Sequence, residues 1–388
     1  MRFSEFEGEW ESKRFGEMAT IKSEKYNPIK ETNFIKCIEL EHLSSETGEL
    51  LGFTDGSQSG SIKNVFNKED VLFGKLRPYL KKYFYATFDG VCSSEIWVLK
   101  GKQILNNFLY RIIQTNSFIE LANQSSGSKM PRADWSIIEK GIFYIPSLAE
   151  QKKISNILSL IDLRIHTQNK IIEDLRLLKR TVINKIFSQQ LKFKDNNGNN
   201  YPDWQVKKMG DVTTIVNKRN KNNEKLPVYS INNKIGFVPQ NEQFEGIDSD
   251  DRGYEIKLYK IIDKNTFAYN PARINVGSIG YSGDLENIII SSLYVCFKTK
   301  EPLNDQFLFQ YLKTDLFNKQ VLKHVEGGVR EYLFYENFAR IRFKLPCFEE
   351  QMKIAGFLSI LDNKIVVETD LLQQLENQKK YLLQNLFI

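Results

Sequence analysis

The chain has 388 residues, of which 41% are hydrophobic and 26% charged, and this composition predicts a globular protein of roughly two to three domains. Its net charge of +6 permits nucleic-acid binding without arguing for it. No apolar run is long enough to span a bilayer, and the charged start "MRFSEFEGEW" excludes a signal peptide, so we expect a cytoplasmic protein.

The cysteines and histidines exclude an evident metal site. Four cysteines are scattered along the chain without close spacing, and only three histidines are present. We therefore predict no metal ligands, and thiols that are buried or inert, at Cys37, Cys92, Cys296 and Cys347.

Four segments follow one another along the chain. Residues 1–145 combine strand-like alternation, as in "VLFGKLRPYLKKYFYATF", with helical spacing in "ILNNFLYRIIQTNSFIELANQ". A helix is expected over 146–190, and a second mixed domain over 191–345 that opens with a polar linker at 191–203. A second helix is expected over 346–388. The pattern favours an α+β class.

The two helical segments are copies of each other. Residues 145–187 align without a gap with 345–387 at an offset of 200, with 12 identities in 43 positions. This spacing is too long for a solenoid repeat and indicates duplication of a domain together with its helix. The globular segments also correspond faintly, in their opening tryptophans Trp10 and Trp204 and in the serine pairs that begin at Ser93 and Ser291.

The helix copies predict an antiparallel coiled coil. Each begins after a proline and has a glutamate in its first turn. A heptad assignment puts Ile154 at position a and Ile171 and Leu178 at position d. Polar residues recur in one layer, and one hypothesis pairs Arg164 with Glu368 across the coiled coil; the alternative is that they face solvent at a kink. The residues assigned to the spacer and to partner docking are Glu150, Gln151, Ile154, Arg164, Gln168, Glu350, Gln351, Ile354, Lys364 and Glu368.

A search for catalytic motifs finds none. "GSIGYSG" lacks the spacing of a dinucleotide-binding loop, and "NPAR" lacks the second proline and the aromatic residue of an amino-methyltransferase loop. No phosphate-binding GxxxxGK[ST] loop is present. We therefore assign no catalytic residue to this chain.

Basic and aromatic residues cluster at matching places in the two halves. Arginine in a glycine-bearing loop can contact a guanine edge, and lysine can neutralise phosphates. For any single residue, a solvated charged surface is the alternative. The candidate DNA-binding residues are Lys75, Arg77, Tyr79, Lys129, Arg132, Lys218, Arg219, Arg273, Arg330 and Tyr332.

The repeated P-x-x-x-E-Q-x-K-I phrase, at 146–154 and 346–354, and the opening "DNNGNNYPDW" of the second half resemble the specificity subunit of a bacterial type I restriction-modification system. The resemblance covers nearly the whole chain. It implies two target-recognition domains, joined by two long helices in an antiparallel coiled coil with pseudo-two-fold symmetry. Each domain would read one half of a bipartite double-stranded DNA sequence.

The resemblance also implies partners and cofactors. The helices would dock two methyltransferase subunits, and restriction subunits would add translocation and cleavage. S-adenosylmethionine, ATP and magnesium would belong to those partners, and this chain would be a non-catalytic subunit without a cofactor. Two alternatives stay open: a stand-alone DNA methyltransferase or nuclease, and a coiled-coil interaction scaffold without DNA binding.

Overall fold

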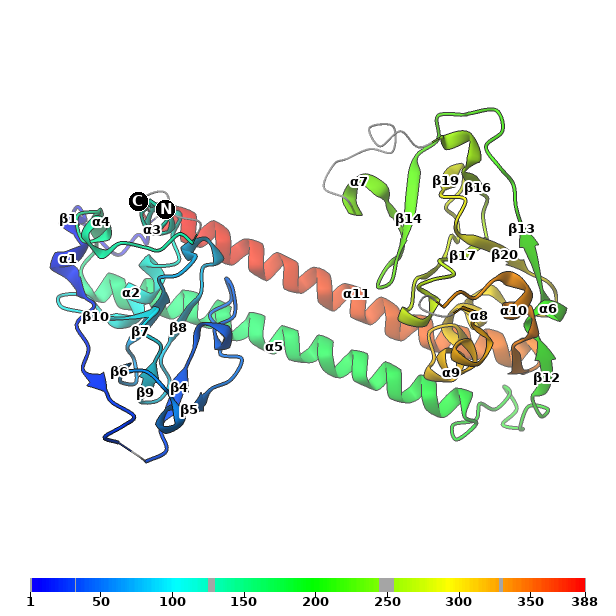
Figure 1. The fold of residues 1–388 in the computed structure, drawn as a ribbon, viewed down its shortest axis with the longest axis horizontal. Helices are drawn as coiled ribbons and strands as arrows, with labels where there is room; N and C mark the ends of the chain where they lie inside the picture. Colours follow the sequence, from blue (N-terminus) through cyan, green and yellow to red (C-terminus); the bar gives the residue numbers. More distant parts are fainter. Residues whose placement is uncertain (1, 32, 125–129, 244–254, 328–330, 388) are drawn as a thin grey trace. The chain divides into compact units, whose positions relative to one another are not determined.

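The computed structural model of the chain describes residues 2–31, 33–124, 130–243, 255–327 and 331–387. It divides into two compact units, the first formed by Met1–Lys170 with Thr369–Ile388 and the second by Ile171–Glu368. Each unit contains one globular domain, the first half of the long helix that follows it and the second half of the other long helix (Figure 1). The predicted α+β class with two long helices is confirmed.

The globular domain of the first unit is built from short strands and helices. Its strands are β1 (Glu11–Arg14), β2 (Ala19–Thr20), β3 (Lys25–Tyr26), β4 (Lys36–Ile38), β5 (Thr54–Asp55), β6 (Lys63–Phe66), β7 (Val71–Gly74), β8 (Tyr83–Tyr85), β9 (Gly90–Cys92), β10 (Ile96–Gly101) and β11 (Ile142–Ile145). Its helices are α1 (Phe15–Met18), α2 (Asn106–Ile112), α3 (Asn116–Asn123), α4 (Trp135–Ile138) and the 3-10 turns η1 (Leu40–His42), η2 (Gly56–Gln58) and η3 (Pro78–Leu80).

The second unit repeats most of these elements in the same order. Its strands are β12 (Gln205–Lys208), β13 (Thr213–Val216), β14 (Val228–Asn232), β15 (Gly236–Pro239), β16 (Lys260–Ile262), β17 (Phe267–Tyr269), β18 (Ile279–Tyr281), β19 (Ile288–Ile290), β20 (Val295–Thr299) and β21 (Arg342–Leu345). Its helices are α6 (Met209–Val212), α7 (Gln240–Gln243), α8 (Asp305–Tyr311), α9 (Asp315–His324), α10 (Tyr335–Arg340) and the 3-10 turns η5 (Ile256–Leu258) and η6 (Ile274–Val276).

The sheets show that the two domains share one topology. The order β2-β10-β7-β8 of the first unit matches the order β13-β20-β17-β18 of the second. A further sheet in each unit contains one parallel pair, β4 with β9 and β14 with β19. Parallel neighbours require a long crossover connection, so two chance hairpins would not reproduce this arrangement. The globular halves are copies of one fold.

Aromatic side chains form the core of each domain. In the first unit the Phe118 ring lies 5.2 Å from Phe15 and 5.1 Å from Phe73. In the second unit Phe297 lies 5.0 Å from Phe267 and 4.8 Å from Phe338. Burying each such ring contributes about 1.5–3 kcal/mol to stability. In each unit this core packs the four-stranded sheet against the short helices. The packing fixes the positions of the loops at the edge of that sheet.

The long helices are α5 (Leu148–Phe187) and α11 (Phe348–Asn385). At the start of α5 the hydroxyl of Ser147 accepts a hydrogen bond from the Glu150 backbone N–H at 3.4 Å, and proline at 146 precedes the cap. No described helix of the chain is sufficiently long and apolar to cross a membrane.

Within each unit the two helices pack antiparallel in the same register. Lys379 of α11 pairs with Asp162 of α5 in the first unit, and Lys179 of α5 pairs with Asp362 of α11 in the second. In an antiparallel pair, each step forward along one helix is matched by a step backward along the other. The first pair therefore sets Arg164 opposite position 377.

The hypothesis that Arg164 pairs with Glu368 is thus wrong. Arg164 is exposed, and Glu368 forms an ion pair with Lys364 of its own helix. The polar layer is only partly buried, since Gln168 and Glu368 are 6% and 9% exposed while Lys364 is exposed.

The heptad assignment is wrong at position d. Ile154 is buried as expected at position a, but Ile171 and Leu178, assigned to d, are exposed. Leu158 and Ile172, which the apolar pattern places at the flanking position e, are buried as expected. Each helix packs against its globular domain as well as against the other helix, and this second contact turns the buried stripe away from the two-helix seam.

Candidate nucleic-acid interface

Three segments of the first unit meet at one edge of the β7–β10 sheet. The backbone N–H of Lys75 donates to the Glu95 carbonyl at 2.9 Å, and that of Arg77 donates to the Pro131 carbonyl at 2.8 Å. Arg77 has a φ of 52°, a left-handed conformation that is costly for a non-glycine residue. The turn therefore holds the exposed Arg77 beside the segment that carries Arg132.

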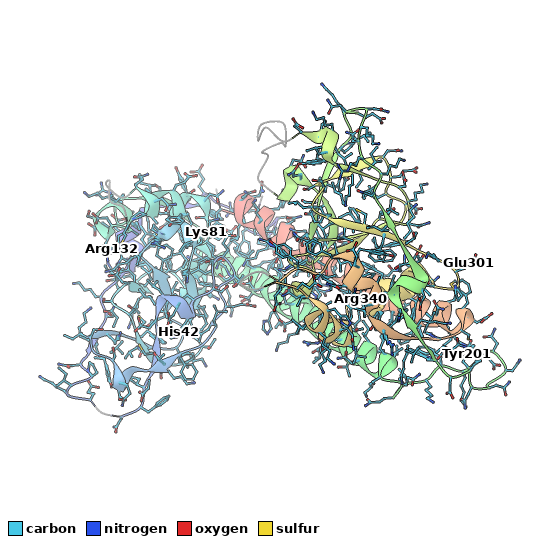
Figure 2. The ribbon with its side chains drawn as sticks, turned by 45° about the vertical axis from the view of Figure 1, so that its right-hand side comes forward. His42, Lys81, Arg132, Tyr201, Glu301 and Arg340 are labelled. Atoms are coloured by element: carbon cyan, nitrogen blue, oxygen red, sulfur yellow. The ribbon has the colours of Figure 1, made fainter. Side chains whose placement is uncertain are left out.

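Arg132 is held by a carboxylate that the sequence did not single out. Its Nε lies 3.1 Å from Oε2 of Glu95 and its Nη2 lies 3.4 Å from Oε1, while 55% of the side chain stays exposed. Figure 2 marks the place of Arg132 on the first unit. Tyr79 in η3 is 51% exposed, and Lys75 is half-buried. The structure thus brings together four of the candidate residues of the first half, and Glu95 orients one of them.

The second unit builds the corresponding edge, and one backbone contact there matches the first unit. The N–H of Leu333 donates to the Pro271 carbonyl at 3.1 Å, as the N–H of Ala133 donates to the Lys75 carbonyl at 2.8 Å in the first unit. Arg273 follows β17 just as Arg77 follows β7, and it is exposed. Tyr332, adjacent to Leu333, is half-buried.

The side chains at this edge differ between the units. Where the first unit has the Glu95–Arg132 ion pair, the second has Tyr332 stacked on Phe334, with ring centroids 5.7 Å apart and planes 6° apart. Leu293 occupies the place of Glu95 in the equivalent turn, because the backbone nitrogen of each donates to a serine Oγ at 3.4 Å. The Leu293 side chain is 78% exposed. One fold therefore presents an arginine-rich edge with an ion pair in one unit, and an edge with Arg273 beside aromatic and apolar groups in the other.

Two candidate residues lie apart from this edge. The Lys218 carbonyl accepts from the Ile261 N–H at 2.8 Å, and its Nζ lies 2.9 Å from the Asp263 carboxylate. Arg219 is exposed and pairs with Lys260 in an isolated bridge, so both residues run along β16 in the other sheet. The structure does not bring them beside Arg273. Lys129 and Arg330 lie outside the described residues.

The repeated glutamate–glutamine–isoleucine set of the helices is internal. The Gln151 side-chain oxygen accepts from the Leu105 N–H at 3.0 Å, and its nitrogen donates to the Pro146 carbonyl at 2.9 Å. Gln351 repeats this with the Asn304 N–H at 2.8 Å and the Pro346 carbonyl at 3.0 Å. The buried members are Glu150, Gln151, Ile154, Glu350, Gln351 and Ile354. They join each helix to its own domain, and their side chains are largely enclosed within that unit.

Sequence reasoning missed the charged residues that join helix to domain and helix to helix. Asp162 contacts Lys379, and it also accepts from the guanidinium of Arg111 in α2. Asp362 contacts Lys179 and accepts from Gln310 at 2.8 Å. A signal was present, because both the aspartates and the lysines are identities of the repeat. Their pairing depends on the register of the two antiparallel helices, which the apolar pattern leaves open.

A duplicated fold with one variable edge in each copy defines a bipartite recognition protein. The sequence model of the type I restriction modification DNA specificity domain matches residues 7–177 and 201–377. The chain therefore belongs to the family of type I restriction-modification specificity subunits and carries two copies of its domain; its function is DNA target recognition.

Individual relatives agree with this assignment. The type I restriction enzyme MjaVIII specificity subunit of Methanocaldococcus jannaschii is 28% identical over 326 residues, which is 76% of this chain and 76% of the relative. The EcoDI specificity subunit of Escherichia coli is 32% identical over 148 residues, 37% of this chain and 33% of that protein.

Solved structures share the fold. The type I restriction-modification S subunit from M. genitalium has a TM-score of 0.60 and 16% identity, covering 98% of this chain and 96% of that one. A chain from a study of type I restriction-modification complex assembly has a TM-score of 0.60 and 17% identity, covering 97% of this chain and 96% of that one.

Proposed function

We propose that each globular domain reads one half of a bipartite double-stranded DNA sequence through the edge described above. The observation that carries this proposal is the pairing of one backbone framework with two different sets of side chains. A shared framework places the reading edge at the same position in each domain, and different side chains select different bases. The first unit offers two arginines for the acceptors of guanine, and the second offers Arg273 together with aromatic and apolar groups for shape and methyl contacts.

The helices would dock two methyltransferase subunits, and restriction subunits would join that assembly. Methylation of a base requires that it leave the stack and enter a catalytic pocket. In this proposal the partners supply that pocket together with S-adenosylmethionine, ATP and magnesium, and this chain contributes no catalytic residue. Within the described ranges, no group of three or more His, Cys, Asp or Glu side chains could hold a metal ion. The assembly would work in the cytoplasm.

Mapping methylated bases in DNA from cells that carry the complete system tests the proposal. We expect two short motifs at a fixed separation, with the unread bases between them free to vary. Deleting the gene for this chain alone should remove the methylation at both motifs. A single continuous motif, or methylation that survives the deletion, would contradict the bipartite reading.

A further inference from the structure

The equivalent buried carboxylates Glu150 and Glu350 have different partners in the two units. In the first unit, Glu150 is 1% exposed and binds the guanidinium of Arg2 with both oxygens, Nε to Oε1 at 3.0 Å and Nη2 to Oε2 at 2.9 Å. The indole N–H of Trp10, which corresponds to Trp204 in the duplicated sequence, is buried without a hydrogen-bond partner among the described residues. Here an arginine side chain from the N-terminal segment covers the glutamate at the start of the long helix.

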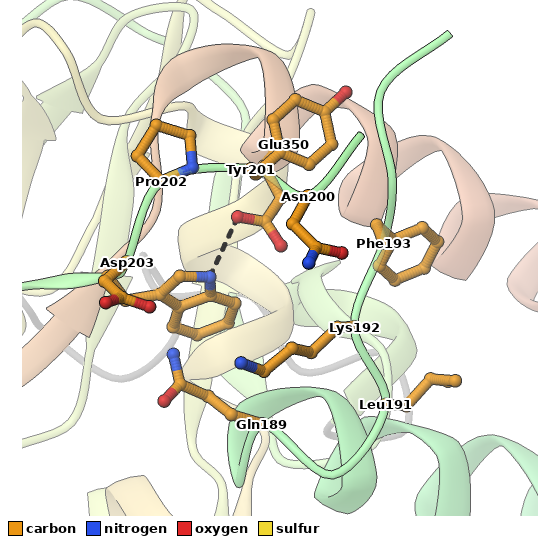
Figure 3. Close-up of a pocket in the computed structure, with 10 residues that line it drawn as sticks. Gln189, Leu191, Lys192, Phe193, Asn200, Tyr201, Pro202, Asp203 and Glu350 are labelled. Carbon is orange, nitrogen blue, oxygen red and sulfur yellow. Dashed lines mark hydrogen bonds between the residues drawn. The ribbon is translucent and has the colours of Figure 1, made fainter. Parts of the chain in front are cut away.

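In the second unit the equivalent Glu350 has no such arginine. It is 4% exposed, and its Oε2 accepts from the indole Nε1 of Trp204 at 2.9 Å (Figure 3). Among the described residues, no lysine, arginine or histidine lies at ion-pair distance from it. Glu350 instead lines a cavity of about 100 Å³. This volume is several times the roughly 10–15 Å³ that one water molecule requires.

The lining of this cavity suits a planar cation. Aromatic side chains come from Phe193, Tyr201 and Trp204, and a further carboxylate comes from Asp203. The cationic side chain in the wall is that of the exposed Lys192. A guanidinium can donate two parallel hydrogen bonds to a carboxylate and stack on aromatic faces. Burial raises the pKa of Glu350, as expected for a carboxyl group without a paired cation.

We propose that the Glu350 cavity binds the guanidinium group of an arginine carried by a protein segment, as Glu150 binds Arg2 in the first unit. The site lies within the second unit, at the linker that precedes β12 and at the start of α11. It is separate from the DNA-reading edge, so its test does not depend on DNA recognition.

Titration of the full chain with methylguanidinium tests this proposal when the indole N–H resonances are followed by NMR. We expect the Trp204 signal to shift and saturate, while the Trp10 signal stays in place because Arg2 fills the first site. In Arg2→Ala the Trp10 signal should shift as well. Glu350→Gln should weaken the Trp204 response by roughly tenfold or more, the effect of losing a charge-assisted pair. The matched variant Glu150→Gln should leave the Trp204 response unchanged.

Two further measurements keep the test decisive. Methylammonium carries the same charge without the planar fork, and it should bind several-fold more weakly; equal affinity would overturn the guanidinium assignment. Lys192→Ala removes the neighbouring positive charge and should strengthen binding, which provides a second variant if Glu350→Gln does not fold. The proposal would be overturned if the Trp204 signal did not shift with methylguanidinium, or if it shifted with the same affinity in Glu350→Gln as in the unchanged protein.

The source of the guanidinium is resolved by a capped tripeptide, acetyl-Ala-Arg-Ala-amide. Tighter binding of the peptide than of methylguanidinium would support an arginine within a protein segment. Binding of methylguanidinium without binding of the peptide would overturn that source in favour of a free small molecule.

Discussion

Nζ of Lys379 lies 2.8 Å from Oδ1 of Asp162, and the residues 200 positions away, Lys179 and Asp362, form the same ion pair in the second unit. Each unit thus takes its aspartate from the helix that follows its own domain and its lysine from the other helix. The lysine side chains are 13% and 12% exposed and the aspartate side chains 29% and 38%, so the contact is partly shielded from water. Such a pair opposes slippage, since a shift by one turn would leave both charges without a partner.

The two aspartates should differ in their contribution to stability. Asp162 also holds the guanidinium of Arg111, which is 3% exposed, whereas Asp362 accepts from the neutral Gln310. We expect Asp162→Asn to cost about 2–4 kcal/mol and Asp362→Asn about 1–2 kcal/mol, because only the first leaves a buried arginine without its carboxylate. Thermal unfolding of both variants measures this. Equal losses would show that the domain contact of Arg111 adds nothing.

Replacing the matched arginines at the reading edges should affect one half-site each. We expect Arg77→Ala and Arg273→Ala, in the assembled complex, each to relax selection in a different half of the target by about 1–3 kcal/mol. Binding to DNA libraries with one half randomised measures this selection. If either variant instead weakens binding to all sequences alike and reduces the salt dependence, that arginine contacts phosphate.

The matched glutamates should respond to neutralisation in opposite directions. The raised pKa of Glu350 means that the folded state keeps its proton at higher pH than the unfolded state, so the free energy of unfolding falls as pH rises above the ordinary value of 4.5. Glu350→Gln removes this loss and should raise the melting temperature at pH 7 but not at pH 4. Glu150→Gln should lower it at pH 7, because Arg2 loses its partner. Melting curves of both variants at pH 4 and pH 7 measure these changes. If both variants shifted the melting temperature at pH 7 in the same direction, the two glutamates would not differ in environment as described.

Thiol labelling should distinguish one cysteine from the rest. Cys37, Cys92 and Cys296 are at most 1% exposed, and Cys347 is partly exposed. Burial raises the pKa of Cys37 to about 11 and that of Cys296 to about 12, so both are neutral and unreactive at pH 8. Iodoacetamide should label at most Cys347 in the native protein and all four after unfolding. Rapid labelling of a second thiol would show that one domain opens easily.

Several features were predictable because they depend on local pattern. The aligned helix copies, the proline before each and the apolar positions around Ile154 predicted two long helices correctly. The serine pairs at Ser93 and Ser291 correctly marked equivalent turns, since their backbone hydrogen bonds match. Register was not predictable in this way, because an apolar stripe fits several alignments of two helices. The mistaken Arg164–Glu368 pair is the result.

The candidate DNA-binding residues could likewise be predicted only in part. Arg77 and Arg132 lie 55 positions apart, and only the crossing of their segments shows that they share one edge. Lys218 seemed equivalent to them by composition alone, yet it lies along β16 in the other sheet. Glu95, which holds Arg132, gave no signal, because a single surface glutamate resembles any other until its neighbour is known.

By itself the sequence determined the duplication, the α+β class and the two helices, because each of these is written in the order and spacing of residues along one segment. Only the tertiary structure decided the helix register, the membership of the reading edges and the unequal surroundings of Glu150 and Glu350. Those properties depend on contacts between residues far apart in the chain, and burial and ion pairing arise only where such residues meet.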